Sequence, residues 1–179
     1  MSGHSAIEQF WYSKNKLSWF FLPFSLFIQL IALTKRFLYQ VKVFRVSRSK
    51  IPVLIVGNIT VGGTGKTPFI SYLVPQLQAK GLSVGIVSRG YQSKATSYPH
   101  IISDSDSVLD IGDEAYMMYS SLKVPMVIGA NRAEAVEKLS QKFKLDLVIS
   151  DDGLQHYSMA RDFEILMIDS TRLFGNQLM

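Results

Sequence analysis

From residue 51 onward, short continuous apolar runs alternate with longer amphipathic stretches. The apolar runs predict five strands, at residues 53–57, 83–88, 124–128, 145–150 and 163–168. The stretches between them predict three helices, at residues 67–80, 112–122 and 131–143. Because the strand runs are apolar throughout rather than at every second position, both faces of the sheet should be covered. The pattern therefore predicts an α/β fold with a mainly parallel sheet and helices on both faces.

Residues near the strand ends are the natural candidates for function, because ligands of such sheets bind beyond the carboxyl ends of the strands. Asn131 and Glu134 fit a capping box at the start of the third helix. Residues 92–110 are mostly polar and are predicted to form a loop.

An uncharged, largely apolar run at residues 17–33 precedes the alternating part. As a helix it would be about 26 Å long, slightly less than the roughly 30 Å hydrocarbon core of a bilayer. Pro23 and Gln29 weaken it further as a full span. Residues 34–50 then mix cations with apolar side chains, a pattern suited to the headgroup layer of a membrane.

Three interpretations of this N-terminal segment compete. A membrane anchor or short embedded helix is favoured over a buried core helix with a basic solvent face. A cleaved signal peptide is the third, and no small-x-small cleavage site follows the run. The six cations after the run, against Lys14 and Lys16 before it, put the next domain on the cytoplasmic side. We therefore expect a membrane-associating segment at residues 1–50 and a globular domain at residues 51–179.

The net charge of +5 is unevenly distributed. Residues 1–50 hold eight lysines and arginines against one acid, giving +7, whereas residues 51–179 hold eleven against thirteen acids, giving −2. A nucleic-acid-binding protein would more often carry its basic patch on the folded domain, so nucleic acid is not an expected partner. Cations among apolar residues indicate anionic lipid instead. No feature indicates an obligate protein partner, and the lack of cysteine excludes disulfides, thiolate zinc sites and cysteine nucleophiles.

A glycine-rich stretch after the first strand is similar to a Walker A phosphate-binding loop. It consists of Thr60, Val61, Gly62, Gly63, Thr64, Gly65, Lys66 and Thr67. Only Thr60 departs from the pattern, which asks for glycine there. Lys66 is expected to reach the β- and γ-phosphates of ATP, and the Thr67 hydroxyl to coordinate Mg²⁺. A turn that binds nothing is the alternative, but the strand before the loop and the helix after it favour phosphate binding.

Two pairs of acids lie near the same edge of the predicted sheet. Asp151 and Asp152 follow the fourth strand, where a Walker B aspartate belongs, so at least one is expected to face Mg²⁺. Asp113 and Glu114 begin the second helix, and one of them is a candidate base or partner of Mg²⁺. The structural alternatives are a solvated turn for the first pair and a favourable helix-dipole interaction for the second.

The loop after the second strand opens onto the same edge. It contains Ser88, Arg89, Gly90 and Tyr91. Arg89 suits contact with a phosphate, and Tyr91 suits stacking on a sugar ring. An ordinary loop arginine is the alternative.

Five stretches together resemble the tetraacyldisaccharide 4′-kinase family, the lipid A 4′-kinases of Gram-negative bacteria. They are residues 57–68, 88–91, 112–114, 151–156 and 174–176. The N-terminal apolar segment is similar as well, so the resemblance spans essentially the whole chain. The phosphate loop of the family looks like this one, which accounts for Thr60.

The resemblance implies transfer of the γ-phosphoryl group of ATP, with Mg²⁺, to the 4′-hydroxyl of a tetraacyl glucosamine disaccharide 1-phosphate in lipid A biosynthesis. It implies that this occurs at the cytoplasmic face of the inner membrane, where a lipid acceptor explains a membrane-associating segment. The implied roles are general base for Asp113, phosphate binding for Lys66, metal association for Thr67, Glu114 and Asp152, and acceptor contact for Ser88, Arg89 and Tyr91.

Members of the family continue for well over a hundred further residues, with a second lobe and a histidine that partners the base. This chain ends at Met179, just after residues 174–176 and inside what looks like a continuing motif. We therefore expect an incomplete P-loop kinase domain without full kinase activity.

The main alternative is a membrane-recruited P-loop switch ATPase of the partitioning and cell-division type. Those proteins carry a lysine just before the double glycine, where this chain has Val61. They also tend to attach through a C-terminal amphipathic helix, whereas the apolar segment here is N-terminal. A fragment with no enzymatic role is a third possibility.

Overall fold

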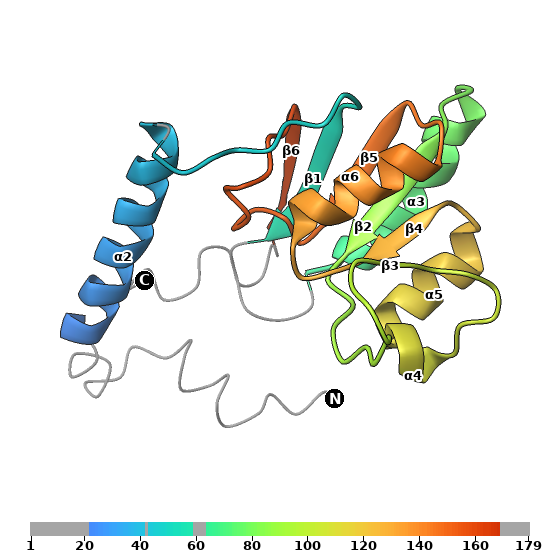
Figure 1. Cartoon of the computed structure of the whole chain (residues 1–179), viewed down its shortest axis with the longest axis horizontal. Coiled ribbons are helices and arrows are strands. Elements are labelled where there is room, and N and C mark those ends of the chain that lie inside the picture. Colours follow the sequence, from blue (N-terminus) through green and yellow to red (C-terminus); the bar gives the residue numbers. More distant parts are fainter. Residues whose placement is uncertain (1–21, 42, 59–63, 169–179) are drawn as a thin grey trace. The chain divides into compact units, whose positions relative to one another are not determined.

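The computed structural model describes residues 22–168, apart from residues 42 and 59–63. The chain divides into two compact units, and residues 46–167 form the larger one. This larger unit contains the sheet and the helices that pack on it (Figure 1). The other unit includes helix α2 and is described by itself below.

The larger unit is built on one six-stranded sheet with the strand order β3-β4-β2-β5-β1-β6. Its strands are β1 (Val53–Asn58), β2 (Val84–Ser88), β3 (His100–Ile101), β4 (Met126–Ile128), β5 (Leu147–Asp151) and β6 (Phe163–Met167). All neighbouring pairs are parallel except β3 and β4, which are antiparallel. The predicted mainly parallel sheet and its five predicted strands are confirmed. β5 lies between β1 and β2, which brings the ends of these three strands together.

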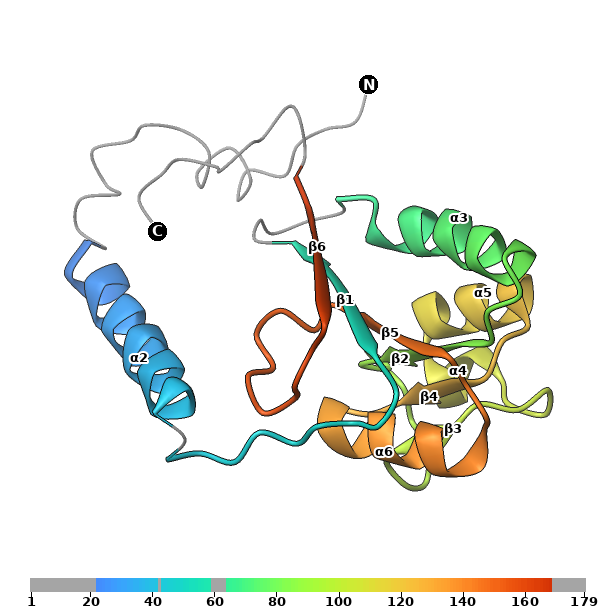
Figure 2. The same cartoon turned by 90° about the horizontal axis from the view of Figure 1, so that it is seen from above.

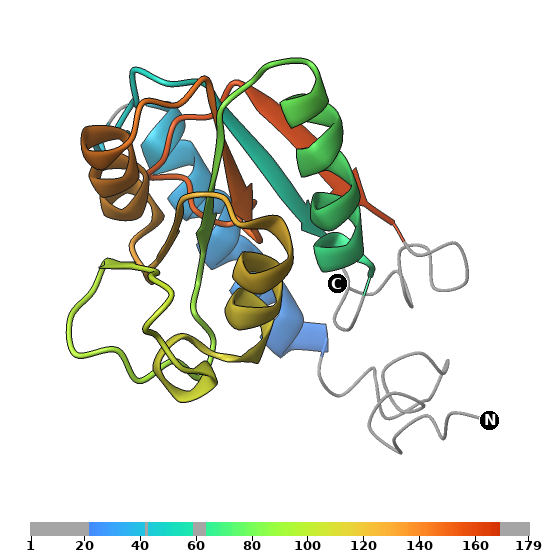
Figure 3. The ribbon, with the colours of Figure 1, turned by 90° about the vertical axis from the view of Figure 1, so that its right-hand side faces the viewer.

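Helices cover both faces of this sheet, as predicted. Figures 2 and 3 show α3 and α5 on one side and α6 on the other. The helices of the larger unit are α3 (Lys66–Ala79), α4 (Val108–Ile111), α5 (Asp113–Leu122) and α6 (Arg132–Lys142). Alternate residues of each strand enter opposite cores: Leu54 and Val56 belong to the α3–α5 side, and Val53 and Ile55 to the α6 side.

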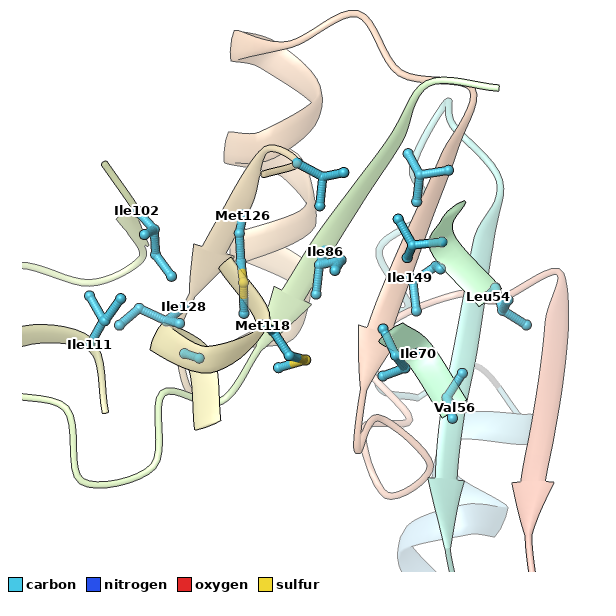
Figure 4. Close-up of a cluster of buried hydrophobic side chains, with 14 residues drawn as sticks. Leu54, Val56, Ile70, Ile86, Ile102, Ile111, Met118, Met126, Ile128 and Ile149 are labelled. Atoms are coloured by element: carbon cyan, nitrogen blue, oxygen red, sulfur yellow. The ribbon is translucent and has the colours of Figure 1, made fainter. Parts of the chain in front are cut away.

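The core on the α3–α5 side is the larger of the two. Figure 4 shows isoleucine and methionine side chains of this core, among them Ile86, Met126 and Ile149. Its fully buried members include Ile70 of α3, Ile111 of α4, Met118 of α5 and Ile149 of β5. Burying one such side chain contributes about 1.5–3 kcal/mol, so this apolar contact is what holds the helices against the sheet.

The prediction of a loop at residues 92–110 is partly wrong. The segment contains the short strand β3 and most of α4. Ser107 and Asp110 form a capping box at the start of α4, in which the Asp110 carboxylate accepts a hydrogen bond from the Ser107 backbone N–H at 2.8 Å. Each element is too short for its periodicity to stand out among polar residues, and pairing with β4 stabilises β3 only in the folded protein.

The N-terminus of α6 is capped by Asn131, as predicted. Its side-chain oxygen accepts a hydrogen bond from the Glu134 backbone N–H at 3.4 Å. The Glu134 carboxylate accepts a hydrogen bond from the Asn131 side-chain amide at 2.6 Å. In a standard capping box this carboxylate accepts from the backbone N–H of the N-cap residue. Here it accepts from the N-cap side chain instead.

Helix α2 spans Leu22–Gln40 and belongs to the smaller unit. It covers part of the predicted apolar run and continues into the basic stretch. Its apolar side chains are largely solvent-exposed, among them Phe24 at 63% and Leu30 at 61%. Of the helices in the described part of the chain, none is both long enough and apolar enough to cross a membrane.

Candidate active site

The carboxyl ends of three neighbouring strands converge at one edge of the sheet. β1 ends at Asn58, β2 at Ser88 and β5 at Asp151. In the parallel register, Val56 of β1 lies opposite Asp151 of β5. Side chains that leave these strand ends are therefore neighbours in space, although they are far apart in sequence. We refer to this edge as the carboxyl edge.

The predicted phosphate loop connects β1 to α3 at the carboxyl edge. Thr60, Val61, Gly62 and Gly63 lie outside the described residues, whereas Thr64, Gly65, Lys66 and Thr67 lie within them. Gly65 is the N-cap of α3 and has φ of +78°, in the left-handed region that glycine adopts without strain. The first N–H groups of a helix lack intrahelical acceptors, so those of α3 are donors at the end of the loop that are not used within the helix.

Lys66 extends along the carboxyl edge toward two other strand ends. Its Nζ donates a hydrogen bond to Asn58 Oδ1 at 2.6 Å and lies 3.7 Å from Asp152 Oδ1. The Lys66 side chain is only 17% exposed. The ammonium group is therefore held beside the phosphate loop.

A hydrogen bond joins the phosphate loop to the acidic pair of α5. The buried Thr67 hydroxyl donates to Glu114 Oε1. These residues are 47 positions apart in sequence. The structure thus brings together two stretches that the sequence singled out separately.

Asp151 is the last residue of β5 rather than the first residue after it, and it is buried, with 3% exposed. The Ser88 hydroxyl donates a hydrogen bond to Asp151 Oδ2 at 3.3 Å. No partner of Asp151 Oδ1 is found within the described part of the chain. Burial raises the pKa of Asp151 to about 6, and the nearby charges of Glu114 and Asp152 act in the same direction.

Asp152 differs from Asp151 in its environment. It is exposed, has φ of +54°, and its backbone N–H donates to the Val56 carbonyl at 2.8 Å. Its carboxylate faces Lys66, as described above. The two adjacent acids thus point to different surroundings, one buried and one in solvent.

Arg132 is a member of this site that the sequence did not indicate. Its side chain is 1% exposed, and its guanidinium donates to the backbone carbonyls of Gly129 and Asp151, the latter at 3.2 Å. Burial lowers the pKa of Arg132 to about 10, although the charges of Asp151 and Asp152 oppose that shift. The only signal in the sequence is an arginine directly after an N-cap, which is ordinary for a solvent-exposed helix start.

A close backbone contact fixes the loop after β2 against the loop before α5. Gly112 has φ of +84°, and a Cβ atom there would lie 2.3 Å from the Tyr91 carbonyl oxygen. The Lys94 backbone N–H also donates to the Asp110 carbonyl at 3.0 Å. Only glycine fits this position, and the contact brings residues 88–91 and 112–114 to the same part of the carboxyl edge.

The remaining predicted site residues lie on the surface around this contact. Asp113 is exposed in the first turn of α5, and Arg89 is exposed at the start of the loop after β2. Tyr91 is 68% exposed. Ser88, by contrast, is buried, with its hydroxyl directed at Asp151.

The acidic residues of the carboxyl edge do not form a ready-made metal cage. Among the residues that the structure describes, no three histidine, cysteine or acidic side chains are grouped as metal ligands. The oxygens at hand come from Thr67, Glu114, Asp151 and Asp152. Hydroxyl and carboxylate oxygens suit Mg²⁺, which commonly keeps several waters and takes few protein ligands.

Comparison with known proteins relates the chain to a group of kinases. A family model described as tetraacyldisaccharide-1-P 4′-kinase, LpxK, matches residues 17–179. A tetraacyldisaccharide 4′-kinase of Pasteurella multocida is 46% identical over 169 residues, which make up 94% of this chain and 52% of that protein. That of Actinobacillus pleuropneumoniae serotype 5b is 44% identical over 166 residues, or 93% of this chain and 51% of that protein. The chain thus spans about half the length of these curated relatives.

A solved structure has the same fold. It is the crystal structure of an apo form of LpxK from Aquifex aeolicus in complex with ATP, with a TM-score of 0.75 and 35% sequence identity. The match covers 84% of this chain and 48% of that one.

Proposed function

The chain belongs to the tetraacyldisaccharide-1-P 4′-kinase family, and we propose that its carboxyl edge is the ATP-binding half of such a kinase. The proposed reaction transfers the γ-phosphoryl group of ATP to the 4′-hydroxyl of a tetraacyl glucosamine disaccharide 1-phosphate. The observation that carries this proposal is the convergence of Lys66, Thr67, Glu114 and Asp151 at one edge of the sheet. The ATP complex of the Aquifex aeolicus relative supports it.

Lys66 is proposed to bind the β- and γ-phosphates of ATP. Asn58 and Asp152 now hold its ammonium group. A triphosphate carries more negative charge than one exposed carboxylate, so it competes well for this ammonium. The backbone N–H groups of residues 60–67 and the N-terminus of α3 are proposed to bind the same phosphates.

The polar atoms near the phosphate loop fit a bound Mg²⁺ ion. Thr64 Oγ1 and Asp151 Oδ1 are buried and lack a hydrogen-bond partner within the described residues. Such orphaned oxygens are rare in folded proteins unless a ligand, ion or water satisfies them. We propose that Thr67, Glu114 and one or both of Asp151 and Asp152 hold the ion directly or through water. When bound, Mg²⁺ neutralises charge that develops on the phosphates.

Asp113 is proposed as the general base that takes the proton from the 4′-hydroxyl. Its exposed position at the start of α5 leaves it accessible to an acceptor from solvent. Arg89 and Tyr91 are exposed beside it and are proposed to contact the acceptor. Ser88 is proposed to act differently, because its buried hydroxyl orients Asp151 instead of reaching outward.

The acceptor is a lipid, so we propose that the enzyme works at the cytoplasmic face of the inner membrane. The exposed apolar side chains of α2 support this, together with the cations at Lys35 and Arg36 on the same helix. Apolar side chains mixed with cations suit an anionic membrane surface.

Calorimetry and a lipid phosphorylation assay on the 179-residue chain test the proposal. We expect magnesium-dependent ATP binding that Asp113→Asn preserves, and only weak ATP-dependent phosphorylation of the lipid disaccharide, which Asp113→Asn abolishes. Absence of ATP binding by the folded chain would contradict the proposal. ATP hydrolysis that is independent of the acceptor would instead indicate a switch ATPase.

A further inference from the structure

A groove lies on the α6 side of the larger unit, away from the phosphate loop. Residues 47–51 form one wall and α6 forms the other, and the space between them has a volume of about 660 Å³. Figure 2 shows this segment passing beside α6 before it enters β1. We refer to it as the α6 groove.

Hydrogen bonds hold the walls of the α6 groove in place. The Ser47 backbone N–H donates to the Ser158 carbonyl at 2.8 Å, and the Ala160 N–H donates to the Ser47 carbonyl at 2.8 Å. Across the groove, the hydroxyls of Ser49 and Ser140 are 3.5 Å apart. The groove is therefore a formed feature of the fold.

The lining of the α6 groove is amphipathic. Its apolar part is made by Ile51, Val136, Phe143, Leu145 and Met159. Its charged part consists of three cations, Arg48, Lys50 and Lys144, and one acid, Glu137. Such a lining suits a ligand that joins an anionic group to a hydrocarbon chain.

Two of the three cations are available to a ligand. Lys50 and Lys144 are exposed, and neither forms an ion pair among the residues that the structure describes. Arg48 lies 3.7 Å from Asp162, and its side chain is 73% exposed. The groove therefore presents a net positive charge.

The cations of the α6 groove lie at the opposite edge of the sheet from the phosphate loop. Lys50 precedes β1, and Lys144 follows α6 and precedes β5. The phosphate loop follows the other end of β1, whose six residues span about 17 Å at 3.3 Å per residue. A ligand held by Lys50 and Lys144 is thus separate from ATP.

We propose that the α6 groove binds an anionic phospholipid of the bilayer. Its phosphate binds Lys50 and Lys144, and an acyl chain lies along the partly exposed apolar wall that includes Ile51 and Phe143. The groove directly follows the apolar and basic stretch of residues 24–46 in sequence. Because that stretch is proposed to contact lipid, the chain would lead from the membrane surface into the groove. Contact of one lipid molecule with this groove would hold the sheet unit itself at the membrane.

Titration with a short-chain lipid below its micelle concentration tests the proposal. Isotope-labelled protein of 179 residues is mixed with dihexanoylphosphatidylglycerol, dihexanoylphosphatidylcholine or inorganic phosphate, and amide resonances are followed by NMR. We expect shifts at residues 47–51 and along α6 with the anionic lipid, and at least tenfold weaker binding of the other two. Equal binding of the two lipids, equal binding of phosphate, or no shift in the groove would each overturn the proposal.

Variants localise the binding. Lys50→Ala/Lys144→Ala is expected to weaken binding of the anionic lipid at least tenfold, whereas Lys80→Ala/Lys142→Ala removes the same charge outside the groove and should leave it unchanged. Ser140→Phe, which fills the groove, should also weaken it. Equal effects of the two double variants would overturn the proposal. Magnesium-dependent ATP binding should persist in all three variants, so the failure of this proposal is distinguishable from failure of the kinase proposal.

Discussion

Aspartates at the two edges of the sheet differ in their hydrogen-bond partners. At the amino edge, Asp146 and Asp162 precede β5 and β6, and each carboxylate accepts a backbone N–H, from Ser83 at 2.8 Å and from Val53 at 2.9 Å. At the carboxyl edge, Asp151 is buried, and its Oδ1 has no hydrogen-bond partner among the residues that the structure describes. Asp146 and Asp162 therefore stabilise the ends of strands. The Asp151 carboxylate, by contrast, has an oxygen that could accept a hydrogen bond or bind an ion.

Within the described ranges, buried polar atoms without a hydrogen-bond partner at the carboxyl edge also belong to residues other than aspartate. Four buried side-chain atoms lack a partner in the described part of the chain: Thr64 Oγ1, Arg132 Nε, Ser150 Oγ and Asp151 Oδ1. All four belong to residues at or next to the carboxyl edge. Since a buried polar atom without a partner costs about 1–3 kcal/mol, their clustering supports the proposed ligand site at this edge.

The largest expected effect concerns phosphate binding at the carboxyl edge. Lys66→Ala should weaken magnesium-dependent ATP binding or turnover by about 10²–10³-fold, because it removes the ammonium group aimed at the phosphates. Lys138→Ala is the matched control, since Lys138 is also partly buried but donates to the Pro99 carbonyl at 2.5 Å. Isothermal titration calorimetry measures both. Comparable losses of ATP affinity in the two variants would contradict a specific role for Lys66 in phosphate binding.

Two glycines with similar positive φ should respond differently to substitution by alanine. Gly112→Ala should lower the free energy of unfolding by about 2–4 kcal/mol, because the new methyl group clashes with the Tyr91 carbonyl in addition to the strain of positive φ. Gly81 has φ of +81° with open space around it, so Gly81→Ala should cost about 1 kcal/mol. Urea unfolding compares the two, and equal costs would show that residues 88–91 and 112–114 are not in close contact.

Asp151→Asn should stabilise the protein while impairing magnesium-dependent ATP binding. Because burial raises the pKa of Asp151 from 3.8 to about 6, its ionised form opposes folding above that range, by up to about 3 kcal/mol. The native state holds this proton more tightly than the unfolded chain, so stability from this group rises as pH falls from about 7 to about 4. We expect a gain of about 1–2 kcal/mol in the variant at pH 7.

Unfolding of wild type and Asp151→Asn across this pH range isolates the effect, since other acids contribute equally to both. The stability difference between the two proteins should shrink toward acidic pH. A variant that is less stable than wild type at pH 7 would show that the Asp151 carboxylate is stabilising, like the aspartates of the amino edge.

The smallest effect is expected at the amino edge. Asp146→Asn removes the charge from a carboxylate that accepts the Ser83 N–H, and should lower stability by about 1 kcal/mol or less. ATP binding should be unchanged. Thermal unfolding and calorimetry check both expectations, and a marked loss of ATP affinity would contradict the structural role assigned to this edge.

Much of the fold follows from local patterns. The apolar runs predict the five parallel strands, and the phosphate loop, both acidic pairs and the loop after β2 are recognisable as short motifs. The short elements β3 and α4 are not predictable in this way, since β3 has two residues and α4 four. Arg132 also escapes prediction, because nothing in its local sequence distinguishes a buried guanidinium from an exposed one.

The sequence by itself determined the succession of the five parallel strands and the three longer helices along the chain, the Walker-like loop and the family to which the chain belongs, because each depends on residues close together along the chain. Only the tertiary structure decided that Asp151 is buried while Asp152 is exposed. It also decided that the Ser88 hydroxyl donates a hydrogen bond to Asp151 and that the Thr67 hydroxyl donates one to Glu114. These pairings depend on the placement of β5 between β1 and β2. Strand order is set by packing across the whole sheet, which no local pattern contains.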